Sequence, residues 1–238
     1  MSWIKTYLES WKRLIRQDKS HVFSKLVWGL KSYGEWKDTI ECGRQSLTDG
    51  QPWITFEARS FVESILTPEA EVFEYGAGGS SVFYSQRVKS VISVEHDKAW
   101  FNQARDALAE RSITNCTLVL SEPEPANESD DTSDTPEAYR SSDEAYMGYS
   151  FRNYVRTIDS FSCLFDFVAI DGRARPSCVA HARHKLKPGG YLMLDNSERP
   201  NYQKAKALLL DWEKHEFPGP GPYGYAFWET TIWRRSSR

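Results

Sequence analysis

Short apolar segments alternate with amphipathic segments along most of the chain, and this alternation is the feature that most constrains its fold. Segments with strand character cover residues 71–76, 90–97, 116–125, 165–172, 191–197 and 225–235. Segments with helical spacing cover residues 80–88, 99–111, 151–161, 178–186 and 202–215. Strands that are apolar on both faces are typical of a mainly parallel sheet that helices bury on both sides. The sequence therefore predicts a doubly wound α/β fold.

The chain has 238 residues, enough for one sizeable core, and the alternating pattern begins only after residue 50. We therefore expect an N-terminal helical extension over 1–50 and one domain over 51–238. The extension carries apolar residues at helical spacing: Ile4, Tyr7, Leu8, Trp11, Leu14 and Ile15. Such a helix covers its own domain or a partner subunit, for instance in a homodimer. Contact with a membrane surface is the alternative.

Residues 121–150 form an acidic insertion, with nine acidic residues and one basic residue for a net charge of −8. The rest of the chain has 29 basic and 24 acidic residues, a net charge of +5. Ser, Asp, Glu and Pro dominate the insertion, so we expect a mobile loop whose aromatic end, AYMGYSFRNY, is able to close over a ligand. The overall charge predicts no nucleic-acid partner.

The cysteines Cys42, Cys116, Cys163 and Cys178 are scattered, without CxxC pairs or histidines at metal-site spacing. No apolar run approaches the roughly 20 residues of a membrane span, and the N-terminus lacks the apolar core of a signal peptide. We therefore expect a cytoplasmic protein without a disulfide framework or a zinc site.

A glycine-rich stretch, EYGAGGSS at 74–81, follows the first predicted strand. In doubly wound sheets, ligands bind beyond the carboxyl ends of the strands, and glycines in the first turn let the ligand touch the backbone. The sequence therefore predicts a ligand site at this turn. The candidate cofactor-binding residues in it are Glu74, Gly76, Ala77, Gly78, Gly79 and Ser80.

Two classes of cofactor compete for this site. A dinucleotide fingerprint requires a third Gly or Ala at position 81, where the chain has Ser81. Glu74, two residues before Gly76, suits a ligand that carries a cation and no pyrophosphate. Glu95 ends the second predicted strand, where a carboxylate accepts two hydrogen bonds from ribose hydroxyls, and this suits either class. A NAD(P)-dependent oxidoreductase therefore stays as the alternative.

The motif E-x-G-x-G-x-S at 74–80, an acid closing the second strand, and FDFVAIDG followed by LKPGGYLMLDN resemble the class I S-adenosylmethionine-dependent methyltransferases. The resemblance covers roughly residues 53–235. It implies a Rossmann-like, mainly parallel seven-stranded sheet with an antiparallel last strand. It also implies that S-adenosylmethionine lies over the first two strands.

The resemblance assigns roles to particular residues. Gly76 and Gly78 contact the amino acid portion of the donor, Glu74 orders the loop, and Glu95 holds the ribose. By the same resemblance, the residues that border the adenine are His96, Ser121 and Glu122. Thr55, before the first sheet strand, closes over the amino acid end of the donor.

Oxygen-bearing side chains end the last two predicted parallel strands, Asp171 on one and Asp195 and Asn196 on the next. Their pattern is similar to the metal ligands of the catechol-type O-methyltransferases, which implies a Mg²⁺ or Ca²⁺ ion that acidifies a substrate hydroxyl. Those enzymes have a lysine three residues after the first aspartate, where this chain has Ala174. The alternative is that Asp171 orients the substrate while Asp195 and Asn196 cap a turn.

Arg173 and Arg175 flank Ala174 in DGRARPS. Paired guanidinium groups clamp a carboxylate or phosphate on a substrate, or else they pair with the acidic insertion. Together these features predict a methyltransferase for a small or medium-sized acceptor, at oxygen, with nitrogen left open. The alternatives are the oxidoreductase and a noncatalytic methyltransferase-like interaction module.

Overall fold

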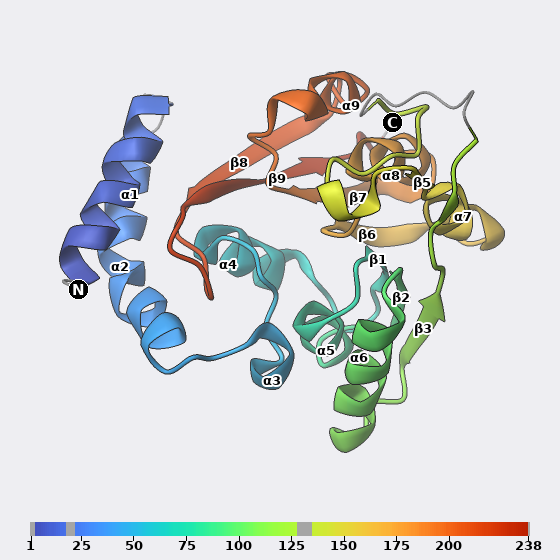
Figure 1. Cartoon of the computed structure of the whole chain (residues 1–238), viewed down its shortest axis with the longest axis horizontal. Coiled ribbons are helices and arrows are strands. Elements are labelled where there is room, and N and C mark those ends of the chain that lie inside the picture. Colours follow the sequence, from blue (N-terminus) through green and yellow to red (C-terminus); the bar gives the residue numbers. More distant parts are fainter. Residues whose placement is uncertain (1–2, 18–21, 128–134, 238) are drawn as a thin grey trace.

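The computed structural model describes residues 3–17, 22–127 and 135–237. Within these residues a seven-stranded sheet has the order β3-β2-β1-β6-β7-β9-β8 (Figure 1). The strands are β1 (Glu71–Tyr75), β2 (Ser90–Glu95), β3 (Cys116–Leu120), β6 (Phe165–Ile170), β7 (Leu186–Asp195), β8 (Glu213–Gly219) and β9 (Trp228–Arg234). The first five of these run parallel, whereas β9 is antiparallel to both β7 and β8. The predicted sheet, including its antiparallel last strand, is confirmed.

The helices that surround the sheet come from all parts of the chain. The α-helices are α1 (Trp3–Gln17), α2 (Val22–Glu41), α3 (Ser46–Asp49), α4 (Phe56–Ile65), α5 (Gly79–Ser85), α6 (Lys98–Glu110), α7 (Arg152–Arg156), α8 (Arg175–Ala182) and α9 (Gln203–Ala207). Short 3₁₀ helices are η1 (Glu144–Tyr146), η2 (Thr157–Ser160) and η3 (Pro200–Tyr202).

Both faces of the sheet are buried, as the apolar strands predict. On β1, Phe73 and Tyr75 join an apolar cluster with α7, α8 and α9, whereas Val72 joins a cluster with α4 and α5. Successive side chains of a strand point to opposite faces, so the two clusters lie on opposite sides of the sheet. Burying each such side chain contributes about 1.5–3 kcal/mol, which is why β1 carries apolar residues toward both sides.

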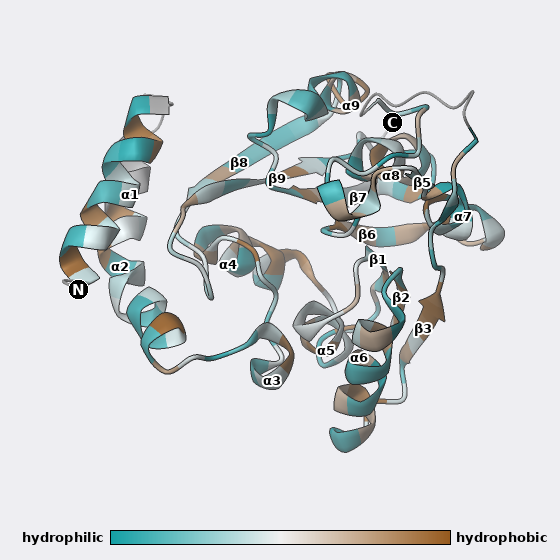
Figure 2. Ribbon diagram, in the orientation of Figure 1, coloured by the Kyte–Doolittle hydropathy of each residue, from teal (hydrophilic) through white to brown (hydrophobic). Residues whose placement is uncertain are grey.

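The predicted helix over 202–215 is wrong in its second half, because α9 ends at Ala207 and β8 begins at Glu213. The edge strand β8 pairs only with β9, and its residues Glu213, Lys214 and Glu216 are exposed. Figure 2 shows β8 as largely hydrophilic. Edge strands commonly carry charges, so the segment lacks the apolar pattern of the central strands.

The acidic insertion begins after β3, which ends at Leu120 rather than at the predicted residue 125. A short antiparallel pair, β4 (Glu124–Pro125) and β5 (Tyr149–Ser150), closes its base. Residues 128–134, part of the predicted mobile loop, lie outside the described residues. The described part after them packs on the body of the protein, with Tyr139 N donating to Ser177 Oγ on α8 at 3.1 Å.

The N-terminal helices α1 and α2 pack against each other and against the segment that precedes β9 (Figure 1). Tyr7, Trp11 and Trp36 are buried with Phe227 beside them. Tyr7 Oη donates to Gly29 O at 2.6 Å, where the missing side chain of Gly29 leaves room for Trp11. The helix α1 thus covers its own chain, although Ile4 and Leu8 stay exposed. In the described ranges, no helix has both the length and the apolar character that crossing a membrane requires.

Candidate active site

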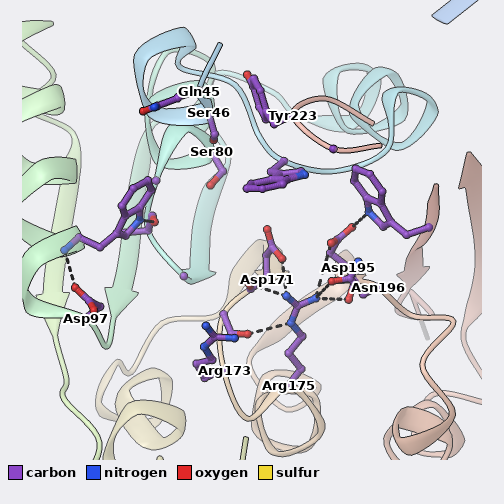
Figure 3. A pocket seen from close by; sticks show the side chains of 18 of the residues that line it. Gln45, Ser46, Ser80, Asp97, Asp171, Arg173, Arg175, Asp195, Asn196 and Tyr223 are labelled. Carbon is purple, nitrogen blue, oxygen red and sulfur yellow. Dashed lines mark hydrogen bonds and ion pairs between the residues drawn. The ribbon is translucent and has the colours of Figure 1, made fainter. Parts of the chain in front are cut away.

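A cavity of about 1070 Å³ opens at the carboxyl ends of β1, β2, β6 and β7 (Figure 3). The chain order reverses between β1 and β6, which is where ligands bind in open α/β sheets. The predicted site residues that line the cavity are Gly76, Ala77, Gly78, Ser80, Glu95, His96, Asp171, Arg173, Arg175, Asp195 and Asn196. We call the part around Gly76–Ser80 and Glu95–Trp100 the β1–β2 side, and the part around Asp171–Arg175, Asp195–Glu198 and 223–228 the β6–β7 side.

The glycines of the turn after β1 have different roles. Gly76 has φ +98°, and a Cβ atom there would lie 2.9 Å from Gly172 N, so the crossing of two loops requires glycine. A Cβ atom on Gly79 would collide with the carbonyl oxygen of Ser46, so this glycine packs against α3 and lies outside the cavity lining. At Gly78, by contrast, the nearest atom to a Cβ would be 3.7 Å away on Trp100. A methyl group at Gly78 would therefore make only ordinary van der Waals contact, with Trp100.

Glu74 lies behind the turn and does not line the cavity. Its Oε2 accepts hydrogen bonds from Ser81 Oγ at 2.6 Å and Ser93 Oγ at 2.5 Å. Ser81 Oγ in turn accepts from Gly78 N at 3.0 Å. Burial raises the pKa of Glu74 to about 7. Ser81, the residue that breaks the dinucleotide fingerprint, thus links Glu74 to the glycine turn and holds it in place.

The carboxylate of Glu95 is largely occupied by backbone N–H groups. Its Oε1 accepts from His96 N at 2.7 Å and Asp97 N at 2.8 Å, and its Oε2 accepts from Ala77 N at 3.1 Å. A carboxylate has about four acceptor positions, so one position on Oε2 remains. Glu95 can therefore accept one further hydrogen bond from a ligand in the cavity, where the sequence predicted two.

Aromatic side chains complete the β1–β2 side. Tyr146, on η1 of the insertion, shares a hydrogen bond of 3.0 Å between its hydroxyl and His96 Nε2. Trp100 on α6 donates its Nε1–H to Ala77 O at 2.6 Å. The aromatic end of the insertion was a sequence signal for Tyr146, whereas Trp100 looked like an ordinary apolar helix residue.

Three other predicted residues lie away from the cavity. Thr55 is buried between α4 and the β8–β9 pair, where its Oγ1 donates to Phe217 O at 3.0 Å. Trp53, two residues earlier, lines the cavity in its place. Ser121 N donates to Glu95 O at 2.8 Å, and neither Ser121 nor Glu122 reaches the lining.

Arg175 is a buried clamp between the ends of β6 and β7. It donates Nε to Gly172 O (3.0 Å), Nη1 to Asp195 O (2.5 Å) and Asn196 Oδ1 (3.1 Å), and Nη2 to Asp171 O (3.0 Å). Its Nη2 also forms an ion pair with Asp171 Oδ1 at 2.8 Å, so four hydrogen bonds and one ion pair hold the guanidinium group. Arg175 thus neither projects a free fork into the cavity nor pairs with the insertion.

The predicted metal ligands Asp171, Asp195 and Asn196 do come together, but around this guanidinium (Figure 3). Asp195 Oδ1 already accepts from Trp228 Nε1 at 2.8 Å and Thr230 Oγ1 at 2.6 Å. A divalent cation here would meet a buried positive charge and oxygens that are already hydrogen-bonded. No group of three His, Cys, Asp or Glu in the described residues suits a metal ion. The residues do not fit the predicted Mg²⁺ or Ca²⁺.

Burial instead raises the pKa of both aspartates. Burial raises the pKa of Asp195 to about 7 and that of Asp171 to about 6, although Arg175 opposes both shifts. The Asp195 side chain is only 4% exposed against 28% for Asp171, so desolvation acts more strongly on Asp195. Asp195 Oδ2 lies 3.8 Å from Arg175 Nη1, beyond hydrogen-bonding distance.

Arg173 pairs with the acidic insertion, which is the alternative to substrate binding that the sequence analysis gave. Its Nη1 lies 2.9 Å from Asp143 Oδ2 of the insertion, and its guanidinium lies over the Tyr146 ring at 5.3 Å. Arg173 thus fastens the insertion to the rim of the cavity.

An aromatic wall, unrecognised in the sequence, closes the β6–β7 side. It consists of Trp53, Tyr223, Tyr225, Phe227 and Trp228. The N-terminal helices hold this wall through its backbone, because Ser10 Oγ donates to Tyr225 O at 2.8 Å and Trp36 Nε1 donates to Gly224 O at 2.9 Å. These hydrogen-bond partners are about 200 positions apart in the chain, so no local sequence pattern predicts the contacts.

Comparison with known proteins finds likeness at the level of structure. No family model matches the sequence, and no curated protein matches it. The O-methyltransferase TomG from Streptomyces achromogenes, solved with SAM, has a TM-score of 0.56 at 14% identity, over 81% of this chain and 90% of that one.

Two further structures are similar. An O-methyltransferase from Bacillus cereus, solved with SAH, has a TM-score of 0.53 at 14% identity, over 74% of this chain and 78% of that one. A putative rRNA-methylase from Clostridium thermocellum has a TM-score of 0.53 at 10% identity, over 76% and 96%. At such identities the likeness establishes a shared fold.

Proposed function

We propose that this chain, whose fold is that of the class I S-adenosylmethionine-dependent methyltransferases, transfers a methyl group from S-adenosylmethionine to an oxygen atom of a small or medium-sized acceptor. The observation that carries the proposal is the charge of the cavity. Its described acidic residues are Glu95, Asp97, Asp171, Asp195 and Glu198. Its arginines are Arg44, Arg173 and Arg175.

Two of these arginines are neutralised from outside the lining, Arg44 by Asp49 at 2.9 Å and Arg173 by Asp143 at 2.9 Å. The cavity therefore has an excess of negative charge. S-adenosylmethionine carries a sulfonium, an ammonium and one carboxylate, so its net charge is positive, whereas a dinucleotide brings a negative pyrophosphate. Charge complementarity thus favours the sulfonium donor over the dinucleotide of the oxidoreductase alternative. The same carboxylates repel the phosphate groups of RNA, which disfavours RNA as the methyl acceptor.

The residues of the β1–β2 side fit this donor. Gly78 lines the cavity without a side chain, which would let the amino acid portion approach the backbone, and the remaining acceptor position of Glu95 suits one ribose hydroxyl. His96 and Tyr146 line the same side of the cavity and would border the base. The sulfonium supplies an electrophilic methyl group, so the chain must provide alignment of the acceptor and removal of its proton.

We assign proton removal to Asp195, because its pKa of about 7 is near the value that general-base catalysis favours at neutral pH. Arg175 and Asn196 hold the end of β7, and Trp228 and Thr230 fix one carboxylate oxygen. The strands β1, β6 and β7 are consecutive neighbours, so Asp195 lies two strand spacings, about 10 Å, from the turn after β1. This leaves room for donor and acceptor side by side.

Calorimetric titration tests the proposal. S-adenosylhomocysteine is expected to bind with micromolar affinity, whereas NADH is expected to give no heat of binding above dilution. Tight binding of NADH alone would end the proposal. Incubation of the protein with methyl-deuterated S-adenosylmethionine and a metabolite pool then separates enzyme from interaction module, because only an enzyme produces labelled products.

A further inference from the structure

A second, smaller cavity lies on the other side of the loop after β6. Its volume is about 220 Å³, and it shares Gly172, Arg173 and Arg175 with the large cavity. We propose that it binds an anionic oxygen group, a phosphate or a carboxylate, and that the methyl acceptor carries this group. The second part of the proposal rests on the proposed function, whereas anion binding itself does not.

The lining of this cavity is strongly basic. It contains four arginines, Arg140, Arg173, Arg175 and Arg199, with Asp143 as the one acidic residue among those described. The whole chain has a net charge of −3, so the charge of this cavity is opposite in sign to that of the molecule. Arginine is the side chain best suited to phosphate and carboxylate groups, because its planar fork offers paired donors.

Two of the guanidinium groups converge on one neutral oxygen. Asn196 Oδ1 accepts from Arg175 Nη1 at 3.1 Å and from Arg199 Nη2 at 3.2 Å. An amide oxygen satisfies the donors of two cations but neutralises neither charge. Asp171 neutralises Arg175, whereas no carboxylate in the described part of the chain lies within 4 Å of Arg199. A bound anion would supply the negative charge that Arg199 lacks.

The ion pair of Arg173 with Asp143 shows how the anionic group of a ligand would contact this guanidinium. The carboxylate of Asp143 lies 2.9 Å from its guanidinium, with both side chains 35% exposed. A half-exposed ion pair contributes little to stability, so an anion on the ligand can replace Asp143 without disturbing the fold.

The helix α8 adds to the attraction, since its N-cap Ala174 and its first residue Arg175 line the cavity. Backbone N–H groups of a first helical turn lack intrahelical partners and favour negative charge. The two cavities share Gly172, Arg173 and Arg175, so an acceptor whose anion binds here would have to pass these residues to reach Asp195 in the large cavity. The acceptor class is therefore a phosphorylated or carboxylated small molecule.

Binding of inorganic phosphate, with acetate as the carboxylate probe, tests the anion site at constant ionic strength against chloride. The wild-type protein is expected to show saturable stabilisation by phosphate or acetate and binding by calorimetry. Arg199→Gln is expected to weaken binding at least fivefold. Its side chain is exposed, so folding is retained. Arg105→Gln, on the exposed face of α6, is the matched control and is expected to bind as the wild type does.

Stabilisation by phosphate alone assigns a phosphate group, and stabilisation by acetate alone assigns a carboxylate. Stabilisation no greater than that by chloride, or unchanged binding to Arg199→Gln, overturns the anion site. Titration with S-adenosylhomocysteine in parallel reports on the proposed function independently. Once an acceptor is found, Arg199→Gln should raise its KM about tenfold with little change in kcat. Efficient turnover of a neutral acceptor with unchanged KM overturns the assignment of acceptor class.

Discussion

The β1–β2 side of the cavity is built from two short stretches of sequence, whereas the β6–β7 side is assembled from segments far apart in the chain. Gly76–Ser80 and Glu95–Trp100 follow directly on paired parallel strands. The other side combines Trp53, the ends of β6 and β7, and the wall at 223–228. In the proposed function, the donor would thus contact a side built by local geometry, and the acceptor would contact a side built by long-range packing. Changes on the two sides should therefore separate donor binding from acceptor use.

The largest expected effect is on the β6–β7 side. Asp195→Asn removes the proton acceptor while keeping the hydrogen bonds from Trp228 and Thr230 possible. We expect kcat to fall about 10²–10⁴-fold, with the affinity for S-adenosylhomocysteine within twofold of the wild type. Steady-state kinetics and calorimetry measure the two quantities. Full activity in this variant would remove Asp195 from catalysis.

Two glycine variants sharpen the analysis of the β1–β2 side. Gly76→Ala places a side chain at φ +98° and 2.9 Å from Gly172 N, so the unfolding free energy should fall by about 2–4 kcal/mol. Gly78→Ala meets nothing closer than 3.7 Å and should change stability by less than about 1 kcal/mol. It should nevertheless weaken donor binding at least tenfold. Unaltered donor binding in Gly78→Ala would show that the donor does not contact the backbone at Gly78.

A pH effect follows from Glu74. Its pKa is about 7 in the folded protein against an ordinary value of 4.5. Between these values the folded state holds a proton that the unfolded chain has released, so this contribution to stability is lost as pH rises from about 4.5 to 7. Relative to Glu74→Gln, the wild type should lose about 2 kcal/mol of unfolding free energy between pH 5 and 8. Denaturant titrations measure this loss, and Asp106→Asn, exposed on α6, keeps Glu74 and should lose the same unfolding free energy relative to Glu74→Gln.

A smaller effect is expected at the N-terminal helix. Ser10→Ala removes the hydrogen bond to Tyr225 O, a contact outside the cavity lining. Loss of one exposed hydrogen bond is worth about 0.5 kcal/mol, so the KM for the acceptor should rise about twofold while donor affinity is unchanged. Ser64→Ala, which removes a similar exposed hydrogen bond to Phe61 O on α4, is the control and should leave KM as it is.

The smallest expected effect is that of a chelator. The Arg175 guanidinium contacts the side chains of both Asp171 and Asn196 and takes the place that a metal ion would have between them. EDTA should therefore leave kcat and KM within experimental error of their untreated values. Loss of activity that Mg²⁺ or Ca²⁺ restores would contradict the assignment of Arg175 as the cation of this cluster.

The sequence predicted the sheet and most of the β1–β2 side because apolar strands and glycine turns are local signals. Asp171 and Asp195 were also brought to one edge by their positions at strand ends. The sequence did not identify Arg175 as the partner of these carboxylates. An arginine at the start of a helix that contacts the ends of two strands leaves no recognisable pattern in the sequence. For a similar reason the sequence named Thr55 where the structure has Trp53. The pairing of β8 with β9 determines which side of the segment around residues 53–55 is buried, and Thr55 lies on the buried side.

The wall of the cavity at 223–228 is attached to α1 and α2 in two ways, through the backbone carbonyls of Gly224 and Tyr225 and through ring contacts of Tyr225 with Trp3 and of Phe227 with Tyr7. The described residues of α1 and α2 can therefore reshape the space for the acceptor although none of them lines the cavity. Chains that share every residue of the cavity but differ in these two helices would be expected to diverge in what they methylate while binding the same donor.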